Sequence, residues 1–175
     1  MQKSIVWLMG LSGAGKSTIA DALKELPPLQ HLKIARIDGD ELRSTLSNDL
    51  GFSTADRYEN LRRAAHICPL LLKENDLVIA SFITPEDQHR KVIQDVLKDY
   101  QLILVWVNCS LQICEMRDPK GLYKAARAGA IQNFTGVHQP FIDPVFADII
   151  LHTDHNTIQH SVQELYIGLK SFLNV

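Results

Sequence analysis

The clearest chemical signal is a run of eight residues near the start of the chain. Residues 10–17 read GLSGAGKS and match the phosphate-binding pattern G-x-x-x-x-G-K-[ST] in full. The glycines let successive backbone N–H groups turn inward onto phosphate oxygens with no Cβ in the way. Lys16 supplies positive charge for the β- and γ-phosphates, and Ser17 offers a hydroxyl to Mg²⁺. The run therefore predicts a bound nucleoside triphosphate with Mg²⁺.

Two features that the sequence lacks narrow the class of P-loop protein. The third apolar run ends in Ala80-Ser81-Phe82, without the aspartate that motor and transport ATPases place there for Mg²⁺. The guanine-reading motif Asn-Lys-x-Asp does not occur in the sequence. A GTPase is thereby disfavoured and a small-molecule kinase is favoured.

Two aspartates, Asp38 and Asp40, follow the second apolar run. Strand ends beside a P-loop point into the ligand crevice. A carboxylate there can orient an acceptor hydroxyl and take its proton late in a loose transition state. An Asx turn that caps the next helix is the alternative, although it explains one aspartate more easily than two.

Basic residues follow the aspartates at helical spacing. Arg43 lies one turn further on, and Arg57 and Asn60 are three apart on the next predicted helix, with Arg63 near the same face. Together they indicate a pocket for an anionic acceptor. Solvated surface arginines explain the same spacing equally well.

Five apolar runs predict strands at residues 5–9, 34–37, 77–81, 102–107 and 147–151. The runs do not alternate with polar residues, which is typical of strands buried on both faces of a parallel sheet. Helical patterns at 17–26, 56–73, 85–97 and 157–173 separate them. This order predicts the α/β class: a three-layer P-loop NTPase sandwich with a five-stranded parallel sheet.

One polar stretch, residues 115–144, interrupts this rhythm before the last strand. A 30-residue excursion inside a compact domain is usually a lid or binding loop. A solvated surface helix with flexible flanks is the alternative. We expect a mobile lid within a single kinase domain of residues 1–175.

Composition excludes several other classes. The chain has 175 residues, 46% of them hydrophobic, and a net charge of −2, so no global field draws it to nucleic acid or to an anionic membrane. The apolar run before Gly10 is too short for a signal sequence or a membrane span. Cys68, Cys109 and Cys114 show no CxxC spacing, which favours reduced thiols in a cytoplasmic protein. The seven histidines form no ligand cluster, so Mg²⁺ at Ser17 is the only metal we expect.

Several segments, in order along the chain, resemble the adenylylsulfate kinases. They are 10–18 (GLSGAGKST), 38–40 (DGD), 50–53 (LGFS), 56–63 (DRYENLRR), 81–85 (SFITP) and 117–129 (RDPKGLYKAARAG), which continues into 133–137 (NFTGV). The resemblance runs from residue 5 to about residue 150, and the 117–129 segment is close to diagnostic.

The resemblance implies transfer of the ATP γ-phosphate to the 3′-hydroxyl of adenosine 5′-phosphosulfate. The products would be 3′-phosphoadenosine 5′-phosphosulfate and ADP, with Mg²⁺ as cofactor. The implied catalytic residues are Asp40, Asp38, Lys16 and Lys120. The implied ATP contacts are Gly10, Leu11, Ser12, Gly13, Ala14, Gly15, Lys16, Ser17 and Thr18, with Cys114 and Arg117 near the adenine.

For the acceptor, the resemblance implies that Arg43, Arg57 and Asn60 bind the phosphosulfate side. The other implied acceptor contacts are Asp40, Ile83, Lys120 and Gly136, with Phe52 and Phe134 sandwiching the acceptor adenine. Either phenylalanine could instead be a core residue. Family members are commonly dimers, so a homodimer is expected.

The sequence also departs from the family pattern. Thr84 replaces a serine sometimes described as a phosphoserine intermediate, Phe141 and Ile142 replace a tyrosine and an acidic residue, and Asp87 replaces a basic residue. We expect direct transfer without a phosphothreonine. The departures leave room for a kinase of the same fold that acts on another nucleotide-like or sugar hydroxyl. A catalytically silent nucleotide-binding partner is the second alternative.

Overall fold

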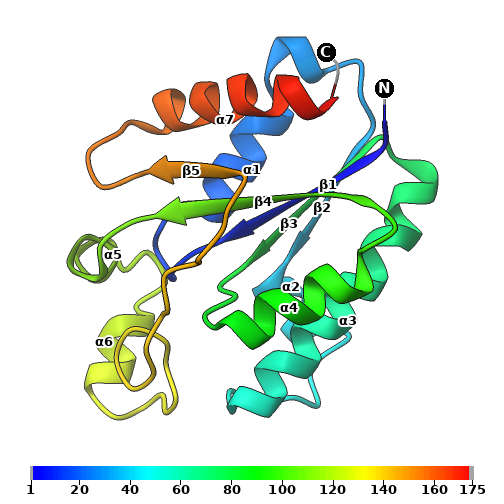
Figure 1. Ribbon diagram of the computed structural model, residues 1–175. Helices are drawn as coiled ribbons and strands as arrows, with labels where there is room; N and C mark the ends of the chain where they lie inside the picture. Colours follow the sequence, from blue (N-terminus) through cyan, green and yellow to red (C-terminus); the bar gives the residue numbers. More distant parts are fainter. Residues whose placement is uncertain (1, 174–175) are drawn as a thin grey trace.

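Five parallel strands form the central sheet of the computed structural model, which describes residues 2–173 (Figure 1). Their order across the sheet is β2-β3-β1-β4-β5. The strands are β1 (Ser4–Met9), β2 (Ile34–Asp38), β3 (Leu77–Phe82), β4 (Gln101–Asn108) and β5 (Ile149–His152). The predicted α/β architecture is confirmed. Only the last strand differs noticeably, since it begins two residues later than its apolar run suggested.

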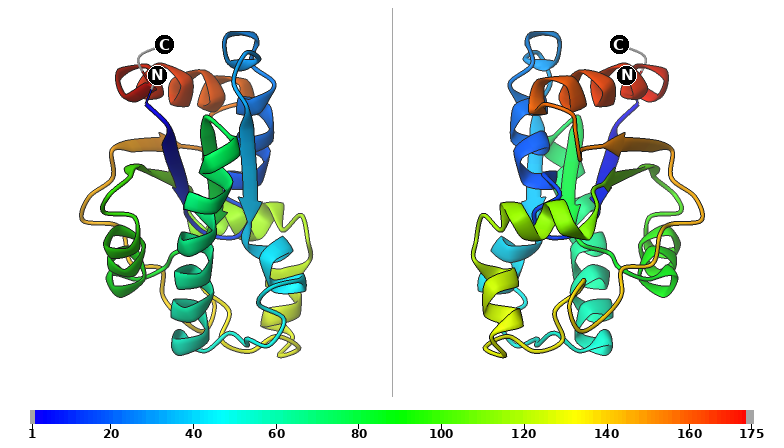
Figure 2. Two further views of the ribbon diagram at one scale, coloured as in Figure 1. Left: turned by 90° about the vertical axis from the view of Figure 1, so that its right-hand side faces the viewer. Right: turned by 90° about the vertical axis from the view of Figure 1, so that its left-hand side faces the viewer.

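Helices cover both faces of the sheet and make the outer layers of the sandwich (Figures 1 and 2). Helices α1 (Lys16–Lys24) and α7 (Ile158–Leu173) lie on one face, and α3 (Thr54–Glu74) and α4 (Asp87–Val96) lie on the other. All six residues of β1 and all six of β3 are buried, which is why their sequences are apolar apart from Ser4 and Ser81.

Alternate residues of each strand enter different cores. In β3, Leu77 and Ile79 pack with Leu23 of α1, whereas Val78 and Ala80 pack with the α3 and α4 side. This alternation decides which way the side chains at the strand ends point.

Four shorter helical segments escaped the sequence prediction. They are a 3₁₀ turn at Pro27–Leu29 and the helices α2 (Gly39–Ser44), α5 (Leu111–Arg117) and α6 (Leu122–Arg127). Helices of six or seven residues span about two turns, too few for a periodic pattern to emerge. Helix α6 and the end of α5 fall inside the predicted lid stretch.

Within residues 2–173, no helix is both long enough and apolar enough to cross a bilayer.

Candidate active site

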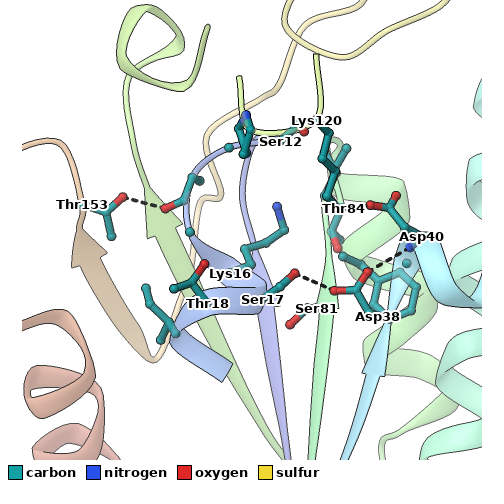
Figure 3. Close-up of a pocket in the computed structure, with 18 of the residues that line it drawn as sticks. Ser12, Lys16, Ser17, Thr18, Asp38, Asp40, Ser81, Thr84, Lys120 and Thr153 are labelled. Atoms are coloured by element: carbon teal, nitrogen blue, oxygen red, sulfur yellow. Dashed lines mark hydrogen bonds and ion pairs between the residues drawn. The ribbon is translucent and has the colours of Figure 1, made fainter. Parts of the chain in front are cut away.

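A cavity of about 820 Å³ opens at the carboxyl edge of the sheet. The strands are parallel, so the ends of β1, β2 and β3 all face it, as do the P-loop and the start of α1 (Figure 3). Its wall includes residues from the P-loop, from α2 and α3, and from the segment after β5. Residues far apart in the sequence therefore meet in one cavity.

The P-loop glycines are required by the space around them. A Cβ at Gly10 would lie 2.4 Å from the carbonyl oxygen of Val107, and one at Gly13 would lie 2.9 Å from that of Cys114. Gly10 has φ +153° and Gly13 has φ +76°, in the region that disfavours other residues. Any side chain at either position would force the loop away from β4 and α5.

Lys16 folds back over its own loop. Its ammonium donates hydrogen bonds to the carbonyl oxygens of Gly10 (2.9 Å) and Leu11 (2.7 Å). Burial lowers the pKa of Lys16 to about 8, although the neighbouring Asp38 carboxylate acts in the opposite direction. Lys16 is thus a partly desolvated cation positioned to interact with phosphate.

Asp38 joins the P-loop to α2. The Ser17 hydroxyl donates to Asp38 Oδ2 at 2.6 Å, and the Asp40 backbone N–H donates to Asp38 Oδ1 at 3.0 Å (Figure 3). Asp38 is therefore the cap of α2, as the Asx-turn alternative suggested for one of the two aspartates. Asp40 has a different environment, because its carboxylate is largely exposed and forms an ion pair with Lys120. That pair raises the pKa of Lys120.

Most residues predicted to contact the acceptor line the same cavity. Arg57 and Asn60 are buried in its wall, and the Arg57 guanidinium donates to the carbonyl oxygens of Phe52 (3.1 Å) and Asn133 (2.6 Å). Burial lowers the pKa of Arg57 to about 10. The Arg43 guanidinium lies 4.5 Å from the centre of the Phe52 ring, which is 46% exposed. The Oδ1 atom of Asn60 has no hydrogen-bond partner among the described residues.

Arg63 does not join this group. It forms ion pairs with Asp49 (2.6 Å) and Glu59 (3.0 Å) on the outer side of α3. The surface interpretation is therefore correct for Arg63, while Arg43 and Arg57 reach the cavity.

Five predicted contacts lie outside the cavity wall, and two of them, Gly10 and Leu11, begin the P-loop. Phe134 is buried and packs edge-on against Tyr123, with ring centres 5.0 Å apart. Gly136 lines a second cavity of about 500 Å³ beneath the 131–144 loop. Cys114 is buried behind the P-loop, against Gly13. By contrast, Ile83 lines the main cavity, and its carbonyl oxygen accepts a hydrogen bond from the Gly10 N–H at 3.1 Å.

Thr84 occupies a strained position in the cavity wall. Its φ of +52° is unusual for a β-branched residue. The side chain is buried, and its hydroxyl accepts a hydrogen bond of 3.0 Å from the indole N–H of Trp7. The Thr84 hydroxyl is therefore held by the core.

The segment after β5 supplies cavity residues that the sequence reasoning missed. Thr153 Oγ1 donates to the Ala14 carbonyl oxygen (2.9 Å), and Arg117 donates to the Thr153 carbonyl oxygen (2.5 Å). Other cavity residues from this segment are Asn156, Thr157, Ile158, Gln159 and Ser161. The predicted parallel sheet could have indicated these residues, because the carboxyl ends of all parallel strands lie at the same edge of the sheet. The residues after the last strand are therefore expected near the P-loop.

The side chains near Ser17 suit a magnesium ion. Hydroxyl and carboxylate oxygens are the donors that Mg²⁺ accepts, and Ser17 and Asp38 supply them side by side. Among residues 2–173 there is no group of three or more His, Cys, Asp or Glu side chains able to hold a metal. This donor set fits an ion held mainly by nucleotide phosphates and water.

Comparisons with known proteins identify the family to which this sequence is similar. The family model described as adenylylsulphate kinase matches residues 2–152. The adenylyl-sulfate kinase of Paraburkholderia xenovorans is 43% identical over 173 residues, which cover 95% of this chain and 92% of that protein. The adenylyl-sulfate kinase of Vibrio vulnificus is 43% identical over 162 residues, which cover 93% of this chain and 78% of that protein.

Solved structures give the same picture. The Mycobacterium tuberculosis APS kinase CysC, solved in complex with AMPPNP and APS, superposes with a TM-score of 0.91 at 40% identity, covering 97% of this chain and 98% of that one. A gluconokinase from Sinorhizobium meliloti superposes with a TM-score of 0.64 at 17% identity, covering 98% of this chain and 94% of that one. At this identity the likeness shows a shared fold alone.

Proposed function

We propose that this chain, which belongs to the adenylylsulfate kinase family, transfers the γ-phosphate of ATP to the 3′-hydroxyl of adenosine 5′-phosphosulfate. One observation carries the proposal. The phosphate-binding residues Lys16 and Ser17 share a single cavity with Asp40 and with the Arg43, Phe52 and Arg57 group. A phosphate donor and an anionic, aromatic acceptor can therefore meet at the strand ends. The product, 3′-phosphoadenosine 5′-phosphosulfate, is a sulfate donor, which gives the enzyme a place in sulfate assimilation.

Each of these residues has a separate role in phosphoryl transfer, set by its position in the cavity. Lys16 and the P-loop N–H groups bind the β- and γ-phosphates, and Asp40 accepts the proton of the attacking hydroxyl. Lys120, now paired with Asp40, moves to the transferring phosphate and neutralises its charge. Ser17 would hold Mg²⁺, which adds charge neutralisation at the same phosphates, with Asp38 orienting the Ser17 hydroxyl.

Transfer is direct in this scheme. A phosphothreonine intermediate would require the Thr84 hydroxyl to leave the Trp7 indole and turn out of the core. Both residues line the cavity, but the Asp40 carboxylate is largely exposed whereas Thr84 is buried. We therefore expect no phosphoryl group on Thr84 during turnover.

The acceptor adenine stacks on Phe52, whose ring is accessible between Arg43 and Arg57. We retain Phe134 as the second face of this sandwich, with Gly136 beside it. For this, Phe134 must exchange its contact with Tyr123 for the ligand. That exchange belongs to closure of residues 115–144, the proposed lid of a single kinase domain.

Release of ADP from ATP, measured in the presence of each member of a panel of acceptors, tests the function. We expect strong turnover with adenosine 5′-phosphosulfate and little with AMP, gluconate or shikimate. Equal turnover with a sugar acid would refute the assigned acceptor. No ADP release with any acceptor, despite tight ATP binding, would indicate a silent nucleotide-binding protein.

We also propose a cytoplasmic homodimer. Cys68, Cys109 and Cys114 are all buried and free, which suits a reducing compartment. Light scattering after size-exclusion chromatography would measure the mass against 19.7 kDa for one chain. A single-chain mass at working concentration would refute the dimer.

A further inference from the structure

Ser81 is a buried hydroxyl without a partner at the place where the phosphates would bind. It is 3% exposed, and its Oγ makes no hydrogen bond within the described residues. It also lines the main cavity. A buried hydroxyl left unpaired is costly, so a partner supplied by a ligand is the natural explanation.

Strand geometry sets the direction of the Ser81 side chain. Ser81 is the fifth residue of β3 and shares a face with Leu77 and Ile79, which pack on the α1 side. Its register partners are Asp38 in β2 and Leu8 in β1. The hydroxyl therefore lies on the face of the sheet where α1 begins.

Figure 3 shows the result: Ser81 lies just below the hydrogen bond between Ser17 and Asp38, with the Lys16 side chain above. Both carboxylate oxygens of Asp38 already accept hydrogen bonds from the protein, one from Ser17 and one from the Asp40 N–H. Within the described residues, Ser81 thus offers a buried, unpaired hydroxyl beside the predicted metal-binding serine.

We propose that Ser81 is a positioning residue that hydrogen-bonds a water molecule on the Mg²⁺ held at Ser17. This inference rests on the proposed function, since it assumes a magnesium nucleotide at the P-loop. A hydroxyl both donates and accepts, so it matches water, whereas phosphate oxygens call only for donors. Mg²⁺ keeps several waters when bound to proteins, and these need partners. In this chain, β3 thus contributes a neutral hydroxyl at a position where many ATPases have a carboxylate, while β2 supplies the charge through Asp38.

Calorimetric titration of ADP, with Mg²⁺ and with EDTA, tests the proposal without any turnover. For Ser81→Ala we expect the affinity in EDTA to stay within about twofold of the native value, and the gain in affinity from Mg²⁺ to fall about 3- to 10-fold, as for one net hydrogen bond. Ser81→Thr, which keeps the hydroxyl, should recover most of the gain. Ser47→Ala is the matched control, because Ser47 is also buried and unpartnered but lies outside the cavity wall.

Two results would overturn the inference. An unchanged magnesium effect in Ser81→Ala would show that the hydroxyl does not serve the metal. An equal loss of affinity in EDTA and in Mg²⁺ would place it on the phosphates or in the loop structure. Failure of the proposed function would look different, because the native protein would then release no ADP in the presence of adenosine 5′-phosphosulfate, whatever the magnesium effect in Ser81→Ala.

Discussion

At the residue scale, Asp40 and Asp38 have separate tasks despite standing two residues apart. Asp38 accepts two hydrogen bonds and caps α2, while the Asp40 carboxylate is exposed beside Lys120. We expect Asp40→Ala to cut turnover roughly 100-fold or more, the loss typical of a positioned base, with ATP affinity largely unchanged. Steady-state kinetics and calorimetry check both quantities. Glu41→Ala, on the exposed side of the same helix, is the control, and near-native turnover of Asp40→Ala would mean that the acceptor site is misplaced.

Lys16 gives a pH dependence whose sign follows from its environment. Burial lowers its pKa to about 8 in the free protein, and bound phosphates favour the charged form and raise that pKa. Below pH 8 the ammonium is already charged, so binding needs no proton; above pH 8, ADP binding must take one up. We therefore expect the ADP affinity to fall as the pH rises from 8 to 9.

Calorimetry in Tris and in HEPES at pH 8.5 measures this uptake, because the two buffers release protons with different enthalpies. The native protein should take up a proton on ADP binding, and the residual binding of Lys16→Ala should take up none. Identical binding enthalpies in both buffers for the native protein would contradict the assignment. Lys16→Ala should also lose catalysis, since its charge no longer stabilises the transferring phosphate.

At the element scale, the sequence predicted most of the fold. Buried parallel strands such as β1 and β3 are unmistakable as apolar runs, and the long helices α3 and α7 carry enough turns for a clear pattern. The P-loop and Asp40 could be placed because their chemistry depends on local spacing. The contacts of Thr153 could not, since its hydrogen bond to Ala14 joins residues 139 apart. The packing of Phe134 against Tyr123 likewise depends on tertiary structure, and the spacing of residues along the sequence does not predict it.

Arg90 of α4 joins two segments that no sequence pattern connects. Its guanidinium pairs with Asp87 (2.7 Å) and donates to the carbonyl oxygens of Thr84 and Pro85, each at 3.4 Å, and of Ile142. The Ile142 N–H in turn donates to the Pro85 carbonyl oxygen at 2.8 Å. Arg90 therefore ties the end of the 115–144 stretch to the turn after β3.

We expect Arg90→Met to lower the free energy of unfolding by about 2–3 kcal/mol, because buried carbonyl groups lose a charged donor. Urea denaturation measures the change. Lys91→Met is the matched control: its ammonium pairs with Asp95 at 3.7 Å on the surface, and such pairs contribute less than about 1 kcal/mol. Equal effects of the two substitutions would show that Arg90 is not a structural link.

At the scale of the whole molecule, the proposed function requires one cavity to bind two ligands through different walls. Phe52 and Arg57 line one end, and Thr153 and Ser161, from the segment around the start of α7, line the other. A ligand at 100 times its dissociation constant stabilises the folded protein by about 2.7 kcal/mol, which raises the melting temperature of a chain this size by roughly 5–10 °C. ADP should give such a shift, and adenosine 5′-phosphosulfate should add a second one.

Phe52→Ala separates the two ends of the cavity. It should retain the ADP shift and lose most of the added acceptor shift, because it removes the accessible ring on which we propose that the acceptor adenine stacks. Lys16→Ala should lose the ADP shift, since Lys16 lines the part of the cavity proposed to bind the phosphates. Differential scanning fluorimetry of both variants with each ligand makes the comparison. If Phe52→Ala diminished both shifts alike, the division of the cavity into a donor end and an acceptor end would be wrong, and Phe52 would be a support for the whole cavity.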